Sequence, residues 1–437
     1  MAKRHAAVGD SSEPLFDEEA ALLLTTLKWG ALGVVSGVCT GAGTRFFLWT
    51  LNKSDDGLAA VAARLKPGLH PYLLLPIAIP ACAWIIRRLA PEAKGHGTEQ
   101  VIKAVHERHG KMADLVAPVK LVSTVLTLAF GGSVGKEGPA AQIGAGITNK
   151  FADFLKLNLH DRRKIVICGI SAGFAAVFGT PISGAIFGVE VLYLGQMEYS
   201  VLFPSIVAGV VAHLVCGSVM PMATVAPGFG GLGHTELVIL SIVSGVFFGL
   251  VALTLILTMD AVGRVARRFA AHPNWVAAAG GVFLVLLYSV FGDSYAGLGL
   301  PTIDQAMAGT MTLVVFGFLV KIVATAVTLE TGGSGGIVTS MFFIGAAAGA
   351  GFAKVLHLPV GVFAAFGLVA VVSAAANTPI AAAVMALELL PAPIGVYAAL
   401  SACTAFLFTG TYSVYPTKRL GLLRSARLES ARAAHSG

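Results

Sequence analysis

The feature that most constrains the fold of this chain is a repeat of its own sequence. The segment 119–128 (VKLVSTVLTL) matches the segment 320–329 (VKIVATAVTL) at an offset of 201 residues. A glycine-rich turn follows each copy, GGSVG at 131–135 in the first and GGSGG at 332–336 in the second. Self-similarity over such a distance indicates two copies of one structural unit.

A further pair of motifs supports the same division. Thr180-Pro181-Ile182 is followed by Glu190, nine residues after the proline, and Thr378-Pro379-Ile380 is followed by Glu388 at the same spacing. The repeated segment, its glycine turn and this motif occur in the same order in both halves. We therefore expect the chain to consist of two homologous halves.

The composition places both halves in a membrane. Of the 437 residues 56% are hydrophobic and only 12% are charged, whereas a soluble protein carries roughly 25% charged residues. A helix needs about 20 mainly apolar residues to cross a bilayer. Segments that approach or reach this length are Tyr72–Ile86, Leu237–Met259, Trp275–Phe291, Met311–Val327 and Leu358–Ala376. The sequence predicts an all-α polytopic membrane protein.

The position of the charges predicts how the chain lies in the membrane. The loops near Cys216–Glu236 and Gly292–Asp304 contain no lysine or arginine, and positive charge collects at 3–4, 87–111, 150–164, 264–268 and 418–432. By the positive-inside rule, the basic loops and both termini face the cytoplasm of a cell whose membrane the chain crosses several times. Short basic loops between spans do not indicate nucleic-acid binding. The five cysteines have no metal-ligand spacing, so we expect no metal site and no cofactor.

Glycine turns that interrupt apolar segments at matching places in two halves are typical of inverted-repeat transporters, whose substrate lies where broken helices meet. Irregular backbone at membrane depth is tolerated where it is buried or lines a wet cavity. A helix that begins there presents free N–H groups and the positive end of its dipole. The sequence therefore predicts a binding site for an anion.

The first half carries its candidate site in Lys136-Glu137-Gly138-Pro139. Pro139 suits the first turn of a helix, and Gly135 and Gly138 allow the backbone to come close to a bound ion. Glu137 is then an intramembrane acid at a helix N-terminus, which is a functional hypothesis by default. It could compete with an external anion for the same N–H groups and leave when protonated. The alternative is a glutamate that only complements the helix dipole.

The second half opens a helix at Gly336-Ile337-Val338, where no acid follows. Ile337 and Val338 could therefore offer backbone N–H groups to the ion. The alternative is a loose glycine-rich turn.

Two enzyme motifs are incomplete. A phosphate-binding GxxxxGK[ST] loop would need glycine in place of Phe130 and serine or threonine in place of Glu137. The GxSG pattern at 332–335 is typical of intramembrane serine proteases, but the downstream histidines, His357 and His435, lie in a short loop and in the tail. A serine without a base is a weak nucleophile, so we expect no enzymatic activity.

The run 132–139 (GSVGKEGP) resembles the signature GxxGREGP of the CLC chloride channel/antiporter family. Three further segments are similar to family motifs: 95–99 stands in the place of GSGIP, 335–340 resembles GGIFAP, and 408–410 with Tyr415 resembles the segment that bears the pore tyrosine. The resemblance covers the chain from about Leu22 to about Arg419.

This resemblance implies a CLC-like homodimer with a complete anion pathway in each subunit, built from two inverted repeats of short, tilted and broken helices. The expected repeats are about 21–216 and 235–415, which together form a transmembrane domain, 21–415. A cytoplasmic segment, 1–20, precedes this domain, and a basic cytoplasmic tail, 416–437, follows it as an amphipathic helix.

The resemblance also implies roles for particular residues. Glu137 would be the external gate, Tyr415 would donate its hydroxyl, and His96 would stand at the inner-site serine position beside Gly97. The remaining anion-binding positions would be Gly138, Ile337 and Val338. Tyr412 is the alternative to Tyr415.

The sequence offers more than one candidate route for protons. Family exchangers often carry two adjacent acids where this chain has Glu190-Val191. Glu190 and Glu388 are expected to be structural, although Glu190 is a candidate proton relay. Glu330 could relay protons or could cap or pair near Lys321. The first hypothesis is exchange of chloride or a similar anion for protons, with Glu137 as gate and proton carrier. The second is a passive chloride channel with Glu137 as gate only.

Overall fold

The computed structural model describes residues 13–65, 70–217, 229–312, 315–416 and 419–420. The elements of the first half are α1 (Glu13–Leu65), η1 (Pro71–Leu74), α2 (Leu75–Leu89), η2 (Pro91–Ala93), α3 (Thr98–Glu107), α4 (Val116–Ala129), α5 (Glu137–Phe154), α6 (Leu159–Phe178), α7 (Pro181–Glu190), β1 (Tyr193–Leu194), η3 (Tyr199–Val201) and α8 (Leu202–Cys216). Those of the second half are α9 (His234–Arg268), α10 (Pro273–Phe291), η4 (Asp293–Tyr295), α11 (Leu300–Met307), α12 (Gly317–Thr331), α13 (Val338–Leu356), α14 (Val360–Ala376), α15 (Pro379–Leu389), α16 (Ala392–Thr409) and β2 (Arg419–Leu420).

The prediction of an all-α polytopic membrane protein is confirmed. Seven helical stretches are long and apolar enough to cross a membrane: Glu19–Leu58, Pro71–Leu89, Tyr199–Cys216, His234–Arg268, Pro273–Phe291, Val338–Leu356 and Ala392–Thr409. Within the described ranges, strand pairing is confined to β1 and β2, two residues each, which run parallel.

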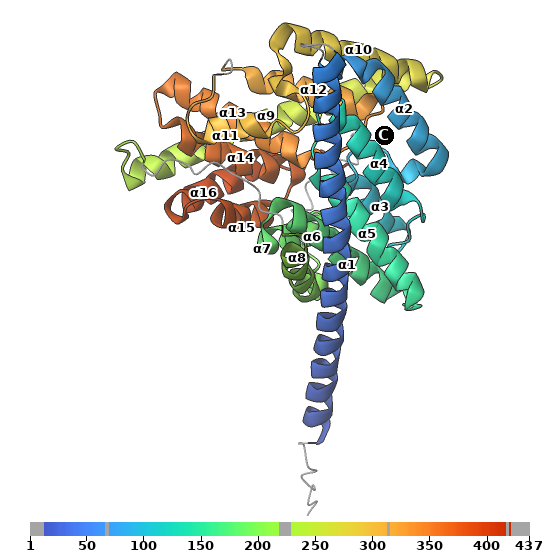
Figure 1. Cartoon of the computed structure of the whole chain (residues 1–437). Coiled ribbons are helices and arrows are strands. Elements are labelled where there is room, and N and C mark those ends of the chain that lie inside the picture. The colour runs from blue at the N-terminus through green and yellow to red at the C-terminus, as the bar shows by residue number, and fades with distance from the viewer. Residues whose placement is uncertain (1–12, 66–69, 218–228, 313–314, 417–418, 421–437) are drawn as a thin grey trace, which may run out of the picture.

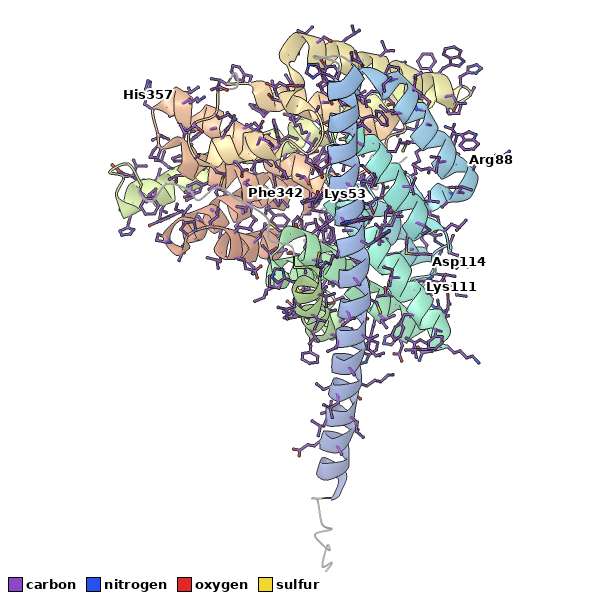
Figure 2. The ribbon with its side chains drawn as sticks, in the orientation of Figure 1. Lys53, Arg88, Lys111, Asp114, Phe342 and His357 are labelled. Carbon is purple, nitrogen blue, oxygen red and sulfur yellow. The ribbon has the colours of Figure 1, made fainter. Side chains whose placement is uncertain are left out.

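α1 runs down the front of the molecule without separating the two halves, because α7 and α8 of the first half lie on the same side of it as most of the second half (Figure 1). In that view α2 to α5 lie on one side of this helix and α9 and α12 to α16 on the other, and the first turns of α1 project beyond the body of the molecule. Large apolar side chains are exposed along the outer helices, among them Leu22, Trp84, Trp275 and Leu407. Figure 2 shows side chains extending outward all along these surfaces. Such exposure suits helices that face lipid.

The repeat is visible as an exchange of hydrogen bonds between the halves. The backbone N–H of Ser133 donates to the hydroxyl of Thr328 at 3.1 Å, and the N–H of Ser334 donates to the hydroxyl of Thr127 at 3.0 Å. Ser133 corresponds to Ser334 in the repeat and Thr127 to Thr328, so the two hydrogen bonds are equivalent. An approximate two-fold relationship between the halves requires such equivalent contacts. The two glycine turns are therefore secured by threonines of the opposite half.

The repeat also extends further toward the N-terminus than the sequence comparison reached. Buried Lys120 donates to the carbonyl of Gly95 at 2.6 Å, and buried Lys321 donates to the carbonyl of Gly297 at 2.7 Å. The loop before α3 and the loop before α11 are therefore equivalent. Sequence similarity missed this pair because only glycines at matching places link the two loops.

The bounds of three segments differ from those expected or lie partly outside the described residues. Within the segment Met311–Val327, α12 begins at Gly317, and among the described residues before it 311–312 and 315–316 are not helical. The expected boundary at residue 20 falls inside α1, which continues through it. The expected tail helix lies outside the described residues except at Arg419–Leu420, which form β2.

Candidate anion site

The site is built where α5 and α13 begin, because the glycine turns before them pair with each other. The N–H of Gly135 donates to the carbonyl of Gly336 at 2.6 Å, and the N–H of Gly336 donates to the carbonyl of Gly135 at 2.5 Å. A Cβ on Gly336 would lie 2.8 Å from the amide nitrogen of Gly138 and 3.2 Å from that of Glu137. The two helix starts are in backbone contact, and glycine is required for this approach.

The carboxylate of Glu137 lies on the start of the opposite helix. Glu137 is completely buried. Its Oε2 accepts the backbone N–H of Thr339 at 3.0 Å, and the Thr339 hydroxyl donates to the carboxylate at 2.5 Å. The acid of one half therefore caps α13 of the other half, where an anion would also be stabilised by the helix dipole.

Thr339 is the residue at this site that the sequence reasoning missed. It lies in the second turn motif (GGIVTS), two residues after Ile337, at a position where N-terminal helical N–H groups have no intrahelical partner. Ile337 is the N-cap of α13 and Val338 its first residue, and both are buried. A polar residue in the first turn of a predicted intramembrane helix is the signal that could have identified Thr339.

Gly97 and Gly138 bring a third segment against the site. A Cβ on Gly138 would lie 2.0 Å from the carbonyl oxygen of His96, and a Cβ on Gly97 would lie 2.7 Å from the carbonyl oxygen of Gly138. Gly97 also has a φ of +81°, which favours glycine. The loop that carries His96 is held in place by Lys120, whose ammonium donates to the carbonyls of Ala93 and Gly95.

His96 of this loop contacts Tyr415. Their rings meet edge to face, with centroids 5.3 Å apart, and both side chains are buried. His96 Nε2 lies 3.5 Å from Oε2 of Glu99, and among the described residues its Nδ1 has no hydrogen-bond partner. Tyr412, by contrast, is 58% exposed. The structure thus brings Tyr415 to His96.

Glu190 has a structural task. Its carboxylate accepts the backbone N–H groups of Ile380 at 3.0 Å and Ala381 at 2.8 Å, which are the first amides of α15. Val191 beside it is fully buried. Both carboxylate oxygens are occupied as acceptors for free amides at a helix start, so this geometry favours the structural role over the relay.

Glu330 lies apart from Lys321, so the expected pairing between them is wrong. They are nine residues apart on α12, which places them on opposite faces of a helix with 3.6 residues per turn. Lys321 instead donates to the carbonyls of Tyr295 and Gly297. Glu330 faces α9, where a Cβ on Gly263 would lie 2.7 Å from its Oε2 and 3.1 Å from a guanidinium nitrogen of Arg267.

Backbone amides and a buried glutamate at the meeting point of two broken helices define a membrane protein built to hold a small anion. The chain belongs to the voltage gated chloride channel family, whose model matches residues 77–410. This assignment also accounts for the motifs that resemble those of CLC proteins.

Several characterised relatives match most of the chain. It is 34% identical to the chloride/fluoride channel protein of Pseudomonas syringae pv. tomato (strain ATCC BAA-871 / DC3000) over 425 residues, which cover 92% of this chain and 89% of the relative. It is 25% identical over 406 residues to the H(+)/Cl(−) exchange transporter ClcA of Klebsiella pneumoniae (strain 342), covering 87% and 84% of the two chains.

Solved structures of antiporters are similar to this chain over most of its length. A CLC-type fluoride/proton antiporter superposes with a TM-score of 0.81 at 27% identity, covering 90% of this chain and 98% of the other. A slow cyanobacterial Cl−/H+ antiporter, at 21% identity, shares the fold with a TM-score of 0.73 over 94% and 99% of the two chains.

Proposed function

We propose that this protein exchanges a small halide anion, chloride or fluoride, for protons across the membrane, and that Glu137 is both gate and proton carrier. The observation that carries the proposal is the bond pair from Thr339 to the buried Glu137 carboxylate at the start of α13. Protonation removes the charge that makes these bonds strong. The neutral side chain then leaves the amides to an incoming anion, so proton binding and anion binding alternate at one place.

The named relatives support both parts of this proposal. One is described as a chloride/fluoride channel, one as an H(+)/Cl(−) exchanger and one structure as a fluoride/proton antiporter. The remaining site residues follow the same scheme: Gly138, Ile337 and Val338 supply backbone at the helix starts, and His96, Gly97 and Tyr415 form the inner wall. Glu330 is the candidate for the inner proton route.

An enzymatic role has no support at the GxSG pattern. The hydroxyl of Ser334 lies 3.0 Å from that of Ser123 and pairs with hydroxyl groups rather than with a base. His357 lies beyond the end of α13 at the edge of the molecule (Figure 2). We assign no catalytic residues.

The organisation in the cell is part of the proposal. The basic loops and the positive-inside rule support a cell-membrane protein with both termini in the cytoplasm. Family membership supports a homodimer in which each subunit holds a complete pathway.

The decisive experiment is transport by purified protein in liposomes. A chloride gradient, and separately a fluoride gradient, is imposed while the internal pH is recorded. Exchange predicts uphill proton movement driven by the transported anion. Glu137→Ala should carry the anion without protons, and wild-type anion flux with no proton movement would establish the passive channel instead. His96→Ser tests whether this wall sets the preference between the two halides.

A further inference from the structure

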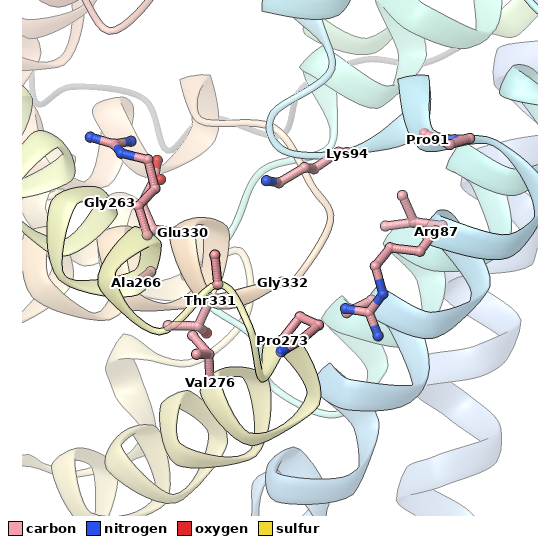
Figure 3. A pocket seen from close by; sticks show the side chains of 14 residues that line it. Arg87, Pro91, Lys94, Gly263, Ala266, Pro273, Val276, Glu330, Thr331 and Gly332 are labelled. Atoms are coloured by element: carbon pink, nitrogen blue, oxygen red, sulfur yellow. The ribbon is translucent and has the colours of Figure 1, made fainter.

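A basic cavity lies between the ends of several helices (Figure 3). Its lining includes Lys94, two residues before His96, and Gly332, the first residue of the second glycine turn. Its volume is about 380 Å³. Arg87 and Lys94 extend into it from one side and Glu330 faces them from the other (Figure 3). Arg267 also lines the cavity, and a guanidinium nitrogen of Arg267 and Oε2 of Glu330 both lie near Gly263. The cavity thus has a formal surplus of two positive charges.

An apolar groove of about 490 Å³ continues this cavity between α9 and α10. The two share Ala266, Val276 and Thr331 in their walls. The large side chains along the groove are Val265, Phe269, Trp275 and Phe283, and each is exposed although apolar. α9 and α10 are both long and apolar enough to cross a membrane, so the groove opens toward lipid.

The polar end of the groove lies at the membrane boundary. α9 ends at Arg268 and α10 begins at Pro273, so the chain turns back here within a few residues. Trp275, 77% exposed in the first turn of α10, has the character of an interfacial aromatic residue. Basic pockets between helix ends on the cytoplasmic side are typical sites for anionic lipid head groups.

From this continuity of charge and apolar surface we infer that the cavity and groove together bind one anionic phospholipid. The phosphate lies among Arg87, Lys94 and Arg267, where guanidinium groups can donate paired hydrogen bonds. An acyl chain lies along the groove past Phe269 and Phe283. The apolar groove favours a lipid over a free phosphate, because a free phosphate has no apolar surface to bury against the groove. The inference does not rest on the transport mechanism, although the cavity also contains Glu330, the candidate for the inner proton route.

The competing contacts of the basic groups leave this binding possible. Arg87 donates to the side-chain oxygen of Asn274. Arg267 lies 3.6 Å from Asp260, a carboxylate that it shares with Arg264, and is 65% exposed. Both guanidinium groups retain further donors, since each has five N–H groups.

The chain supplies a matched control for the test. Arg88 and Arg268 directly follow Arg87 and Arg267 in sequence but do not line the cavity. Figure 2 shows Arg88 at the outer edge of the molecule. The double variants Arg87→Gln/Arg267→Gln and Arg88→Gln/Arg268→Gln have the same net charge, but only the first removes two of the three cationic side chains of the cavity.

The full chain is reconstituted in nanodiscs of phosphatidylcholine with a small fraction of phosphatidylglycerol, and the lipid that stays bound after extraction is weighed by native mass spectrometry. Wild type should retain one phosphatidylglycerol in preference to phosphatidylcholine. The cavity variant should weaken this retention by about fivefold for each arginine removed, and the control should match wild type. Equal retention by the two double variants would overturn the inference.

A second pair of variants tests the groove without changing charge. Ala279→Trp fills the groove, whereas Val290→Trp introduces the same side chain at an exposed position of α10 outside it. Only the first should reduce phosphatidylglycerol retention. If soluble glycerol phosphate protects the protein from heat as strongly as phosphatidylglycerol does, and Ala279→Trp has no effect, the cavity binds a soluble anion and the lipid assignment fails. Size-exclusion profiles and melting temperatures report whether each variant is folded.

Discussion

Glu190 and Glu388 cap each other's helices. The carboxylate of Glu190, at the end of α7, caps the start of α15, and the carboxylate of Glu388, near the end of α15, caps the start of α7. Glu190, the last residue of α7, accepts from Ile380 and Ala381 at the start of α15, and Glu388 in α15 accepts from Ile182 and Ser183 at the start of α7. Four backbone amides are thereby satisfied by two acids some 200 residues apart. The pair holds the two halves in register at a point separate from the glycine turns.

This exchange predicts that Glu190→Gln and Glu388→Gln destabilise the protein to a similar degree. Each amide side chain can accept only one of the two N–H groups, and the loss should be about 1–3 kcal/mol per substitution. Thermal unfolding in detergent measures it. Proton coupling should remain intact in Glu190→Gln, and a folded but uncoupled variant would show that Glu190 relays protons. Glu236→Gln, at an exposed cap on α9, is the control and should have a smaller effect.

Thr339→Val should weaken the closed gate while leaving the fold unchanged. The substitution removes the hydroxyl donor to Glu137 but keeps the backbone N–H bond and the side-chain volume. A hydrogen bond to a charged group contributes about 1.5–3 kcal/mol, which corresponds to roughly a 10- to 150-fold shift between bound and released carboxylate. Anion flux in liposomes should become less dependent on acid pH. Thr339→Ser retains the donor and should behave as wild type, whereas identical flux in all three proteins would contradict the capping role.

Gly138→Ala should abolish transport. Its Cβ would lie 2.0 Å from the carbonyl oxygen of His96, which is backbone and cannot move aside without displacing the loop. Overpacking of this kind costs about 1–3 kcal/mol in stability. Gly57→Ala, in α1, meets nothing within 4 Å and should leave transport unchanged. Transport assays together with melting temperatures separate lost function from lost folding, and an active Gly138→Ala protein would refute the close packing at the site.

Lys120→Met and Lys321→Met should both destabilise the protein, but only the first should alter anion preference. Each lysine is buried and donates to two carbonyls, which methionine would leave unsatisfied at a cost of roughly 1–3 kcal/mol for each group. The loop held by Lys120 carries His96, whereas the equivalent loop held by Lys321 lies before α11. The ratio of chloride to fluoride flux is the measurement, and equal changes in both variants would show that the Lys120 loop has no special role.

The sequence by itself determined the features that depend on local spacing. Apolar length predicted the spans, the offset of the repeat predicted two halves, and glycines followed by Pro139 predicted a helix that starts inside the membrane with Glu137 in its first turn. These features can be predicted because a helix produces a regular pattern of apolar and polar residues among neighbours in the sequence. Where the shared positions were only glycines, as in the loops held by Lys120 and Lys321, the same reasoning failed.

Only the tertiary structure decided which groups meet. In the structure Glu137 accepts hydrogen bonds from Thr339 of α13, and Glu190 caps α15. Glu330 faces α9 and not Lys321. These partners come from opposite halves or from opposite faces of a helix, so no local period relates them. The way the halves pack around their approximate two-fold axis determines which carboxylate reaches which free amide, because a buried amide at a helix start must find an acceptor in whatever chain lies beside it.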